Sequence, residues 1–200
     1  MNATKNLTTV APEQAGLDAG KLEWITDHIN KNYIEPGKIA GCQVYVNRHG
    51  HTGYFRSFGM KDAERAAPMT DDTIFRLYSM TKPVVSVALM QLFEKGYFQL
   101  NDPVHRFIPS WKNHEVWVSG SGADMVTRPP RSPMTMKHIL SHTGGITYGG
   151  DRNEVDKAYR EHGVTRQNGQ TLTSFLDSLA KVPLRFDPGE QWLYSLSTDV

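Results

Sequence analysis

Hydrophobic and polar residues along the first 60 positions follow a helical spacing and then a strand spacing. Leu22, Ile25 and Ile29 recur every three or four residues, which predicts a helix over about residues 18–32 with these side chains on one face. Residues 41–58 then alternate apolar and polar side chains around a polar, glycine-containing centre. This pattern predicts a β-hairpin with a tight turn at its centre.

Beyond about residue 60 the strand pattern fades and helical patterns separated by proline- and glycine-rich loops take over. Residues 79–95 are the strongest helical segment and are apolar on nearly every side, so we expect this helix to be buried in a core. Residues 112–133, rich in glycine, serine, proline and arginine, predict a long surface loop. Shorter helices are predicted at 101–107, 135–141 and 171–181.

The change of pattern divides the chain into two predicted parts, residues 1–60 and residues 61–200. Lys and Arg number 22 against 21 Asp and Glu, a net charge of +1, which gives no electrostatic reason to expect nucleic acid or an acidic membrane surface as a partner. No apolar stretch approaches the roughly 20 residues of a membrane span, and no secretory signal is evident. We therefore expect a soluble, cytoplasmic protein. The single cysteine, Cys42, excludes an internal disulfide and a multi-cysteine metal site.

Ser79 and Lys82 form a Ser-x-x-Lys motif at the start of the most apolar predicted helix. The free N–H groups of a first helical turn favour negative charge on a serine oxygen, and Lys82 lies on the same helix face. Burial of this helix would lower the pKa of Lys82, so that a neutral amine could accept the serine proton. The alternative is that Ser79 is an N-cap and Lys82 a solvated residue. A second copy at Ser178 and Lys181 lies late in its predicted helix, where a structural role is favoured.

Four segments in the same order resemble the serine β-lactamase and penicillin-binding-protein superfamily, in its class C β-lactamase-like branch. The match spans about residues 15–200 and is closest to the family VIII carboxylesterases. The segments are 75–84 (FRLYSMTKPV), 100–104 (LNDPV), 134–145 (MTMKHILSHTGG) and 188–195 (PGEQWLYS).

The resemblance implies an α/β (α+β) fold of the β-lactamase/transpeptidase type, with an antiparallel sheet flanked by helices and a second, mainly helical domain. Ser79 would be the nucleophile at the cleft between the domains, Lys82 its partner, and Tyr194 the general base or proton relay. The β-lactamases of this branch usually have an asparagine two residues after the tyrosine, where this chain has Leu196. Leu196 cannot hydrogen-bond the amide side chain of a β-lactam.

The resemblance therefore implies an esterase that cleaves short-chain acyl esters through an acyl-enzyme on Ser79. The alternatives are a β-lactamase or D-Ala peptidase acting on amides with the same residues, and a non-catalytic binding module of this fold. Trp117 and Tyr148 are candidates for substrate binding together with Leu196, although both aromatic side chains could simply pack. No metal or organic cofactor is implied, and the expected partner is a small-molecule ester.

Two histidines, His138 and His142, are four residues apart, a spacing that metal ligands can have. No third ligand accompanies them, so we expect them to cap a helix and pack in a loop. The family's sheet takes strands from both ends of a chain about twice as long, so this chain is expected to hold only the N-terminal part. A two-stranded sheet leaves an open edge; we therefore expect the 200-residue chain alone to be inactive or to aggregate.

Overall fold

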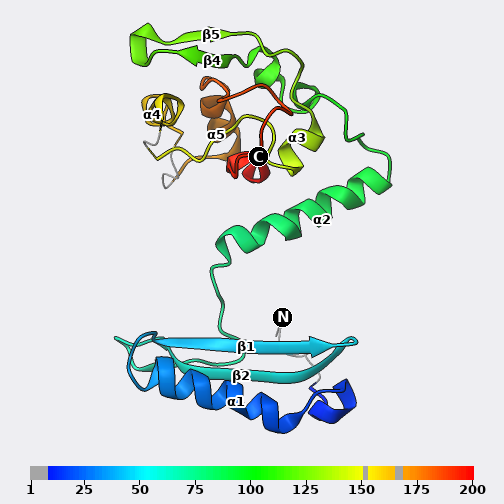
Figure 1. Ribbon diagram of the computed structural model, residues 1–200, viewed down its shortest axis with the longest axis vertical. Coiled ribbons are helices and arrows are strands. Elements are labelled where there is room, and N and C mark those ends of the chain that lie inside the picture. Colours follow the sequence, from blue (N-terminus) through cyan, green and yellow to red (C-terminus); the bar gives the residue numbers. More distant parts are fainter. Residues whose placement is uncertain (1–8, 151–152, 165–168) are drawn as a thin grey trace. The chain divides into compact units, whose positions relative to one another are not determined.

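The computed structural model describes residues 9–150, 153–164 and 169–200 and divides the chain into two units (Figure 1). Unit 1 is Met1–Arg76 and unit 2 is Leu77–Val200. Each unit has its own cluster of buried hydrophobic side chains. No helix of the described residues is long and apolar enough to cross a membrane.

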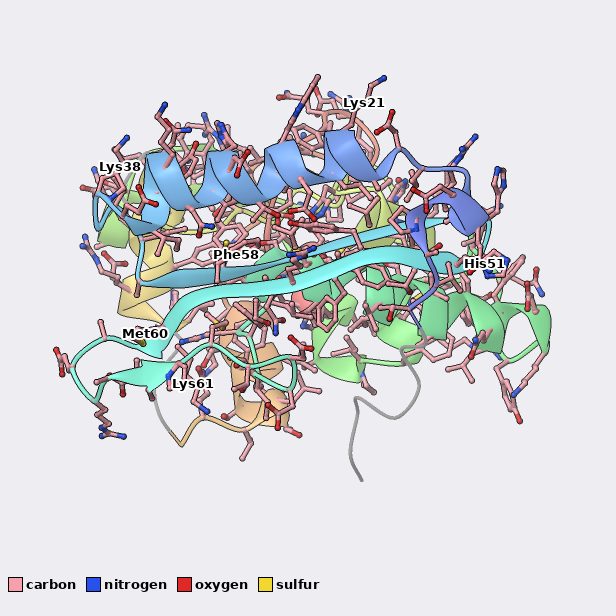
Figure 2. All side chains as sticks on the ribbon, turned by 90° about the horizontal axis from the view of Figure 1, so that it is seen from below. Lys21, Lys38, His51, Phe58, Met60 and Lys61 are labelled. Carbon is pink, nitrogen blue, oxygen red and sulfur yellow. The ribbon has the colours of Figure 1, made fainter. Side chains whose placement is uncertain are left out.

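Unit 1 consists of a helix laid on one face of a small sheet. Helix α1, Ala19–Ile29, begins where predicted, because the side chain of Asp18 accepts a hydrogen bond from the Lys21 backbone N–H at 3.0 Å. The buried side chain of Phe58 lies between α1 and the strands, whereas Lys21 points away from them (Figure 2). The predicted apolar face of α1 is confirmed, since its residues pack on this cluster.

The predicted hairpin is formed by strands β1, Gly41–Arg48, and β2, His51–Asp62, which pair antiparallel. Its two-residue turn holds His49 and Gly50 at φ 52° and 79°, the left-handed conformation that right-twisted hairpins favour. A short strand that the sequence pattern did not reveal, β3 (Ala67–Pro68), pairs with β2 and gives the order β1-β2-β3.

Unit 2 is mainly helical, and it confirms the helices predicted near 79–95, 135–141 and 171–181. Residues 101–107 form only a 3₁₀ turn, Val104–Arg106. One further helix was not predicted. In chain order the elements are α2 (Thr81–Glu94), β4 (Val116–Ser119), β5 (Val126–Arg128), α3 (Met136–Leu140), α4 (Glu154–Glu161) and α5 (Leu172–Leu179).

The prediction of a loop over residues 112–133 is wrong at its centre, where β4 and β5 pair as an antiparallel hairpin. The Trp117 N–H donates to the Leu184 carbonyl at 2.9 Å, and the Leu184 N–H donates to Glu115 at 2.7 Å. The strand preference of the valines therefore decides the local structure, despite the glycines and prolines of this segment. Val116 is buried in the core of unit 2 and fixes the strand there.

The expected burial of the apolar helix is also wrong within unit 2. No residue of α2 is fully buried, and Val84 and Val87 are well exposed. The partly buried positions form one face, because Lys82, Ser86, Leu89, Met90 and Phe93 recur at helical spacing. A helix that is apolar on all sides is buried only when other elements pack against every side. Within the described part of unit 2, neighbouring elements cover α2 along this one face only.

Asp187 anchors the segment that leads to Tyr194. Its buried carboxylate accepts hydrogen bonds from Arg128 at the end of β5 and from the backbone N–H of Arg131 at 2.8 Å. The hydrogen bond from Arg128, joined by the Arg131 N–H and both guanidinium charges, lowers the pKa of Asp187 to about 2, although burial raises it.

We expect the Asp187→Asn variant to melt about 2–4 °C below the wild type at pH 7, because two arginines lose their anion. The native pKa is depressed, so this stabilisation is complete above the unfolded value of about 3.9 and is lost as the pH falls towards 2. Thermal melts of the full-length protein between pH 7 and pH 2 measure the difference. Asp177→Asn, on an exposed carboxylate of α5, is the control and should leave the melt unchanged. Equal melting of wild type and Asp187→Asn at pH 7 would contradict the prediction.

Candidate active site

Ser79 lies in a 3₁₀ turn, Tyr78–Met80, that leads directly into α2. Its side chain is exposed. The preceding residue, Tyr78, has φ 48°, a left-handed conformation that costs energy for a residue with a Cβ atom. The sharp turn of the backbone at Tyr78 thus presents Ser79 at the start of the helix.

Lys82 is a largely buried cation next to Ser79. Only 11% of its side chain is exposed, and its Nζ lies 2.8 Å from Oδ2 of Asp199, in the 3₁₀ turn Leu196–Asp199. Burial lowers the pKa of Lys82, but the hydrogen bond to Asp199 and its negative charge raise it more, so the pKa lies above its ordinary value. The expectation of a neutral amine is therefore wrong, and the reason is a carboxylate that neutralises the cost of burying the ammonium.

Two tyrosines flank this ammonium. The rings of Tyr148 and Tyr194 are stacked, with centroids 5.6 Å apart and planes 10° apart. The Nζ of Lys82 lies 5.5 Å from the ring centroid of Tyr194 and 5.7 Å from that of Tyr148, within cation–π range. The phenols, the ammonium and the Asp199 carboxylate form a cluster, which we call the Lys82 cluster.

A buried polar network holds the loop that carries Tyr148. The Thr147 hydroxyl donates to the buried Asp156 carboxylate at 2.6 Å, and the Thr147 N–H donates to the Tyr159 hydroxyl at 2.8 Å. Both partners lie on α4, and burial raises the pKa of Tyr159 to about 12, so its hydroxyl keeps its proton. The Thr147 carbonyl accepts the N–H of Leu196 at 3.2 Å. Helix α4, absent from the sequence prediction, therefore positions both tyrosine-bearing segments.

The structure brings three of the predicted site residues together: Lys82, Tyr148 and Tyr194. Ser79 lies one helical turn before Lys82, and among the described residues its hydroxyl makes no hydrogen bond to Lys82 or Tyr194. The predicted nucleophile is thus near the cluster in sequence and exposed, while its predicted partners are already assembled.

Two predicted substrate-binding residues have other surroundings. Trp117, on β4, lies under the Arg185 guanidinium at 4.5 Å, and its Nε1 donates to the Gly120 carbonyl at 3.0 Å. Leu196 is 5% exposed and belongs to the hydrophobic core of unit 2. Its backbone N–H donates to the Thr147 carbonyl, and the contact of Leu196 with substrate stays a prediction.

Sequence reasoning missed Asp199 and recognised the two histidines only as structural residues. The Asp199 signal, an acidic residue five positions after the tyrosine, is visible in the sequence but has no meaning without the turn that folds it back. His138 caps α3 as expected, since its Nδ1 accepts the Thr135 N–H at 3.2 Å. In the part of the chain that the structure describes, no group of three His, Cys, Asp or Glu side chains could hold a metal ion.

Comparison with known proteins shows which family and which proteins this chain is similar to. Residues 27–200 match the family model described as Beta-lactamase. Esterase EstB of Burkholderia gladioli is 32% identical over 192 residues, which cover 94% of this chain and 46% of that protein. The acyltransferase calJ of Penicillium decumbens is 31% identical over 135 residues, covering 67% of this chain and 31% of the relative.

Among solved structures, EstCE1, described as a hydrolase with promiscuous acyltransferase activity, superposes with a TM-score of 0.72 at 29% identity. The match covers 92% of this chain and 45% of that one. The chain therefore spans less than half the length of these relatives. The neighbours have the β-lactamase/transpeptidase-like fold, and this chain matches an N-terminal portion of it.

Proposed function

The chain belongs to the β-lactamase family, and from this premise we propose that it carries the nucleophile and the proton-transfer residues of a serine enzyme acting on carboxylic esters. Its substrates in this proposal are short-chain acyl esters. The observation that carries the proposal is the Lys82 cluster, one helical turn after Ser79, in which an ammonium held by Asp199 faces the Tyr194 ring. The esterase names of two relatives support the same class of substrate.

In the proposed reaction Tyr194 is a proton relay: the Ser79 Oγ attacks the ester carbonyl and its proton passes to the Tyr194 oxygen, while the proton that the Tyr194 hydroxyl already carries passes to the ester oxygen of the leaving alcohol. The tetrahedral intermediate collapses, the C–O bond to the alcohol breaks, the neutral alcohol departs, and Tyr194 keeps the proton taken from Ser79. Water then attacks the acyl-Ser79 ester along the same proton route and releases the acid. Lys82, kept charged by Asp199, is not the proton acceptor here; its positive charge stabilises the anions that form beside it.

Transfer of the acyl group to an alcohol instead of water is a second candidate function, because acyltransferases are among the relatives. The chemistry on Ser79 is identical up to the acyl-enzyme, and only the second nucleophile differs. Amide hydrolysis is disfavoured, since Leu196 offers no hydrogen bond to an amide side chain and lies in the core.

A labelling experiment on the full-length protein tests the proposal. We expect a fluorophosphonate probe to label one residue, and peptide mass mapping to place the label on Ser79. p-Nitrophenyl butyrate should be hydrolysed, with little turnover of a chromogenic cephalosporin. Added butanol should yield butyl butyrate if acyl transfer competes with hydrolysis.

The outcomes separate the alternatives. Rapid cephalosporin turnover would contradict the ester assignment and favour amide chemistry on the same residues. Absence of any label in folded full-length protein would overturn the enzymatic proposal and leave a non-catalytic binding module. A label on a serine other than Ser79 would overturn the assignment of the nucleophile.

A further inference from the structure

His142 grips the chain on both sides of Tyr194. Its backbone carbonyl accepts the N–H of Leu193 at 3.0 Å, and its Nδ1 accepts the N–H of Ser195 at 3.2 Å. Leu193 and Ser195 are the immediate neighbours of Tyr194, so one residue fixes the backbone before and after it. His142 reaches both because it has φ 57°, a left-handed conformation at the end of α3.

The imidazole also contacts the Tyr194 side chain. The two ring centroids are 4.8 Å apart with planes tilted by 41°, and Tyr148 stacks on the same tyrosine. Tyr194 is thus held at its backbone by hydrogen bonds and at its ring by two aromatic neighbours. Its orientation towards Lys82 therefore depends on the position of the His142 ring.

The hydrogen bond fixes the state of the imidazole. A backbone N–H can only donate, so Nδ1 must carry a lone pair, and in the neutral ring the proton is then on Nε2. Ser195 is fully buried, and its hydroxyl lies 3.3 Å from the same Nδ1. The buried Ser197 hydroxyl lies 2.7 Å from the Ser195 hydroxyl. A proton added to Nδ1 would face the Ser195 N–H, and the buried N–H would lose its acceptor.

We propose that His142 is a positioning residue for Tyr194 and that protonation of its Nδ1 releases the tyrosine, which makes the reaction sensitive to acid. This inference rests on the proposed function, in which Tyr194 moves the protons. We call the hydrogen bonds that His142 accepts from Leu193 and Ser195, together with the contact of its ring with Tyr194, the His142 clamp. The clamp is closed, with these contacts made, when the imidazole is neutral. It opens when a proton on Nδ1 breaks the hydrogen bond from Ser195.

The surrounding charges agree with a neutral imidazole near pH 7. Burial, followed by the positive charge of Lys82, lowers the pKa of His142, and the negative charge of Asp199 opposes them. Tyr148 and Tyr194 are the other titratable groups of the cluster that faces this ring. Since the native pKa is depressed, the clamp is fully closed above the value of free histidine, about 6.5, and it opens only at lower pH, as the pH falls through the depressed native pKa.

Three variants of the full-length protein test the clamp. His142→Ala removes the acceptor, and we expect it to lower kcat for p-nitrophenyl butyrate at least about tenfold at pH 7.5 with little change in KM. His142→Asn keeps an acceptor oxygen near the Nδ1 position, tolerates the left-handed conformation and cannot titrate. It should recover most of the activity that alanine loses and shift the acidic limb of the kcat profile to lower pH.

His138→Asn is the matched control, because His138 also accepts a backbone N–H through Nδ1 but holds the start of α3 rather than Tyr194. It should retain the acidic limb of the wild type. A wild-type acidic limb in His142→Asn, or full activity in His142→Ala, would overturn the clamp.

The ¹⁵N chemical shifts of the His142 imidazole, measured in the Ser79→Ala protein, give a readout that needs no activity. A neutral ring protonated at Nε2 is expected at pH 7.5. If that tautomer is found but the wild type hydrolyses no ester, the proposed function fails and the clamp stands. If ester hydrolysis is found but Nδ1 carries the proton at pH 7.5, the clamp fails and the function stands.

Discussion

The Ser79→Ala variant should lose ester hydrolysis by a factor of about 10³ or more in kcat/KM, and the fluorophosphonate label with it. The loss is expected to be this large because, under the proposed function, alanine removes the oxygen that forms the acyl-enzyme and leaves only binding and electrostatic stabilisation. Steady-state kinetics with p-nitrophenyl butyrate measures the change. Since Ser79 is exposed and its replacement leaves no buried partner unpaired, the variant should have the same melting temperature as the wild type.

The chain offers its own control for this substitution. Ser178 and Lys181 repeat the Ser-x-x-Lys spacing, but Ser178 lies near the end of α5 rather than at the start of a helix. Ser178→Ala should leave both activity and labelling at the wild-type level. Equal losses in the two variants would indicate a general effect on folding and would remove the case for Ser79.

Tyr194→Phe is expected to lower kcat by about 10²–10⁴-fold, the range typical for loss of a general acid–base group. The ring, its stacking on Tyr148 and its contact with Lys82 are retained in phenylalanine, so the loss isolates the hydroxyl. Single-turnover kinetics should show the loss in acylation, where the Ser79 proton must first be accepted.

Tyr148→Phe decides between the two stacked phenols. Lys82 lies almost equally far from both rings, so distance does not distinguish them; the position of Tyr194 in the 188–195 segment does. We expect Tyr148→Phe to cost less than about tenfold in kcat. A larger loss for Tyr148→Phe than for Tyr194→Phe would assign the proton transfer to Tyr148.

Local sequence signals were sufficient where each element is defined by its own residues. Asp18 begins α1 because its side chain accepts a neighbouring N–H, and His49 with Gly50 turns the hairpin because both adopt left-handed backbone. Ser79, Lys82 and Tyr194 could be singled out for a different reason, since their family's motifs are short and contiguous. Their proposed catalytic roles stay predictions until the variants are measured.

Features that depend on distant partners could not be predicted. Asp199 gains its role from Lys82, which is more than a hundred residues away, and the resulting ion pair reversed the expected direction of the Lys82 pKa. Strand β4 is fixed by Leu184, again far along the chain. The apolar pattern of α2 gives the helix correctly but not how much of it unit 2 covers, because hydropathy reports what a surface prefers and not what lies against it.

The turn from Tyr194 to Asp199 has a consequence for how this chain can change in length during evolution. Both residues meet Lys82, and the turn between them has about three residues per helical turn. One inserted or deleted residue between them would rotate Asp199 by roughly a third of a turn, about 120°, away from the ammonium. Surface loops accept such changes at little cost. This six-residue segment should therefore tolerate amino-acid substitutions but not insertions or deletions. Homologous proteins should keep its length even where its amino acids differ.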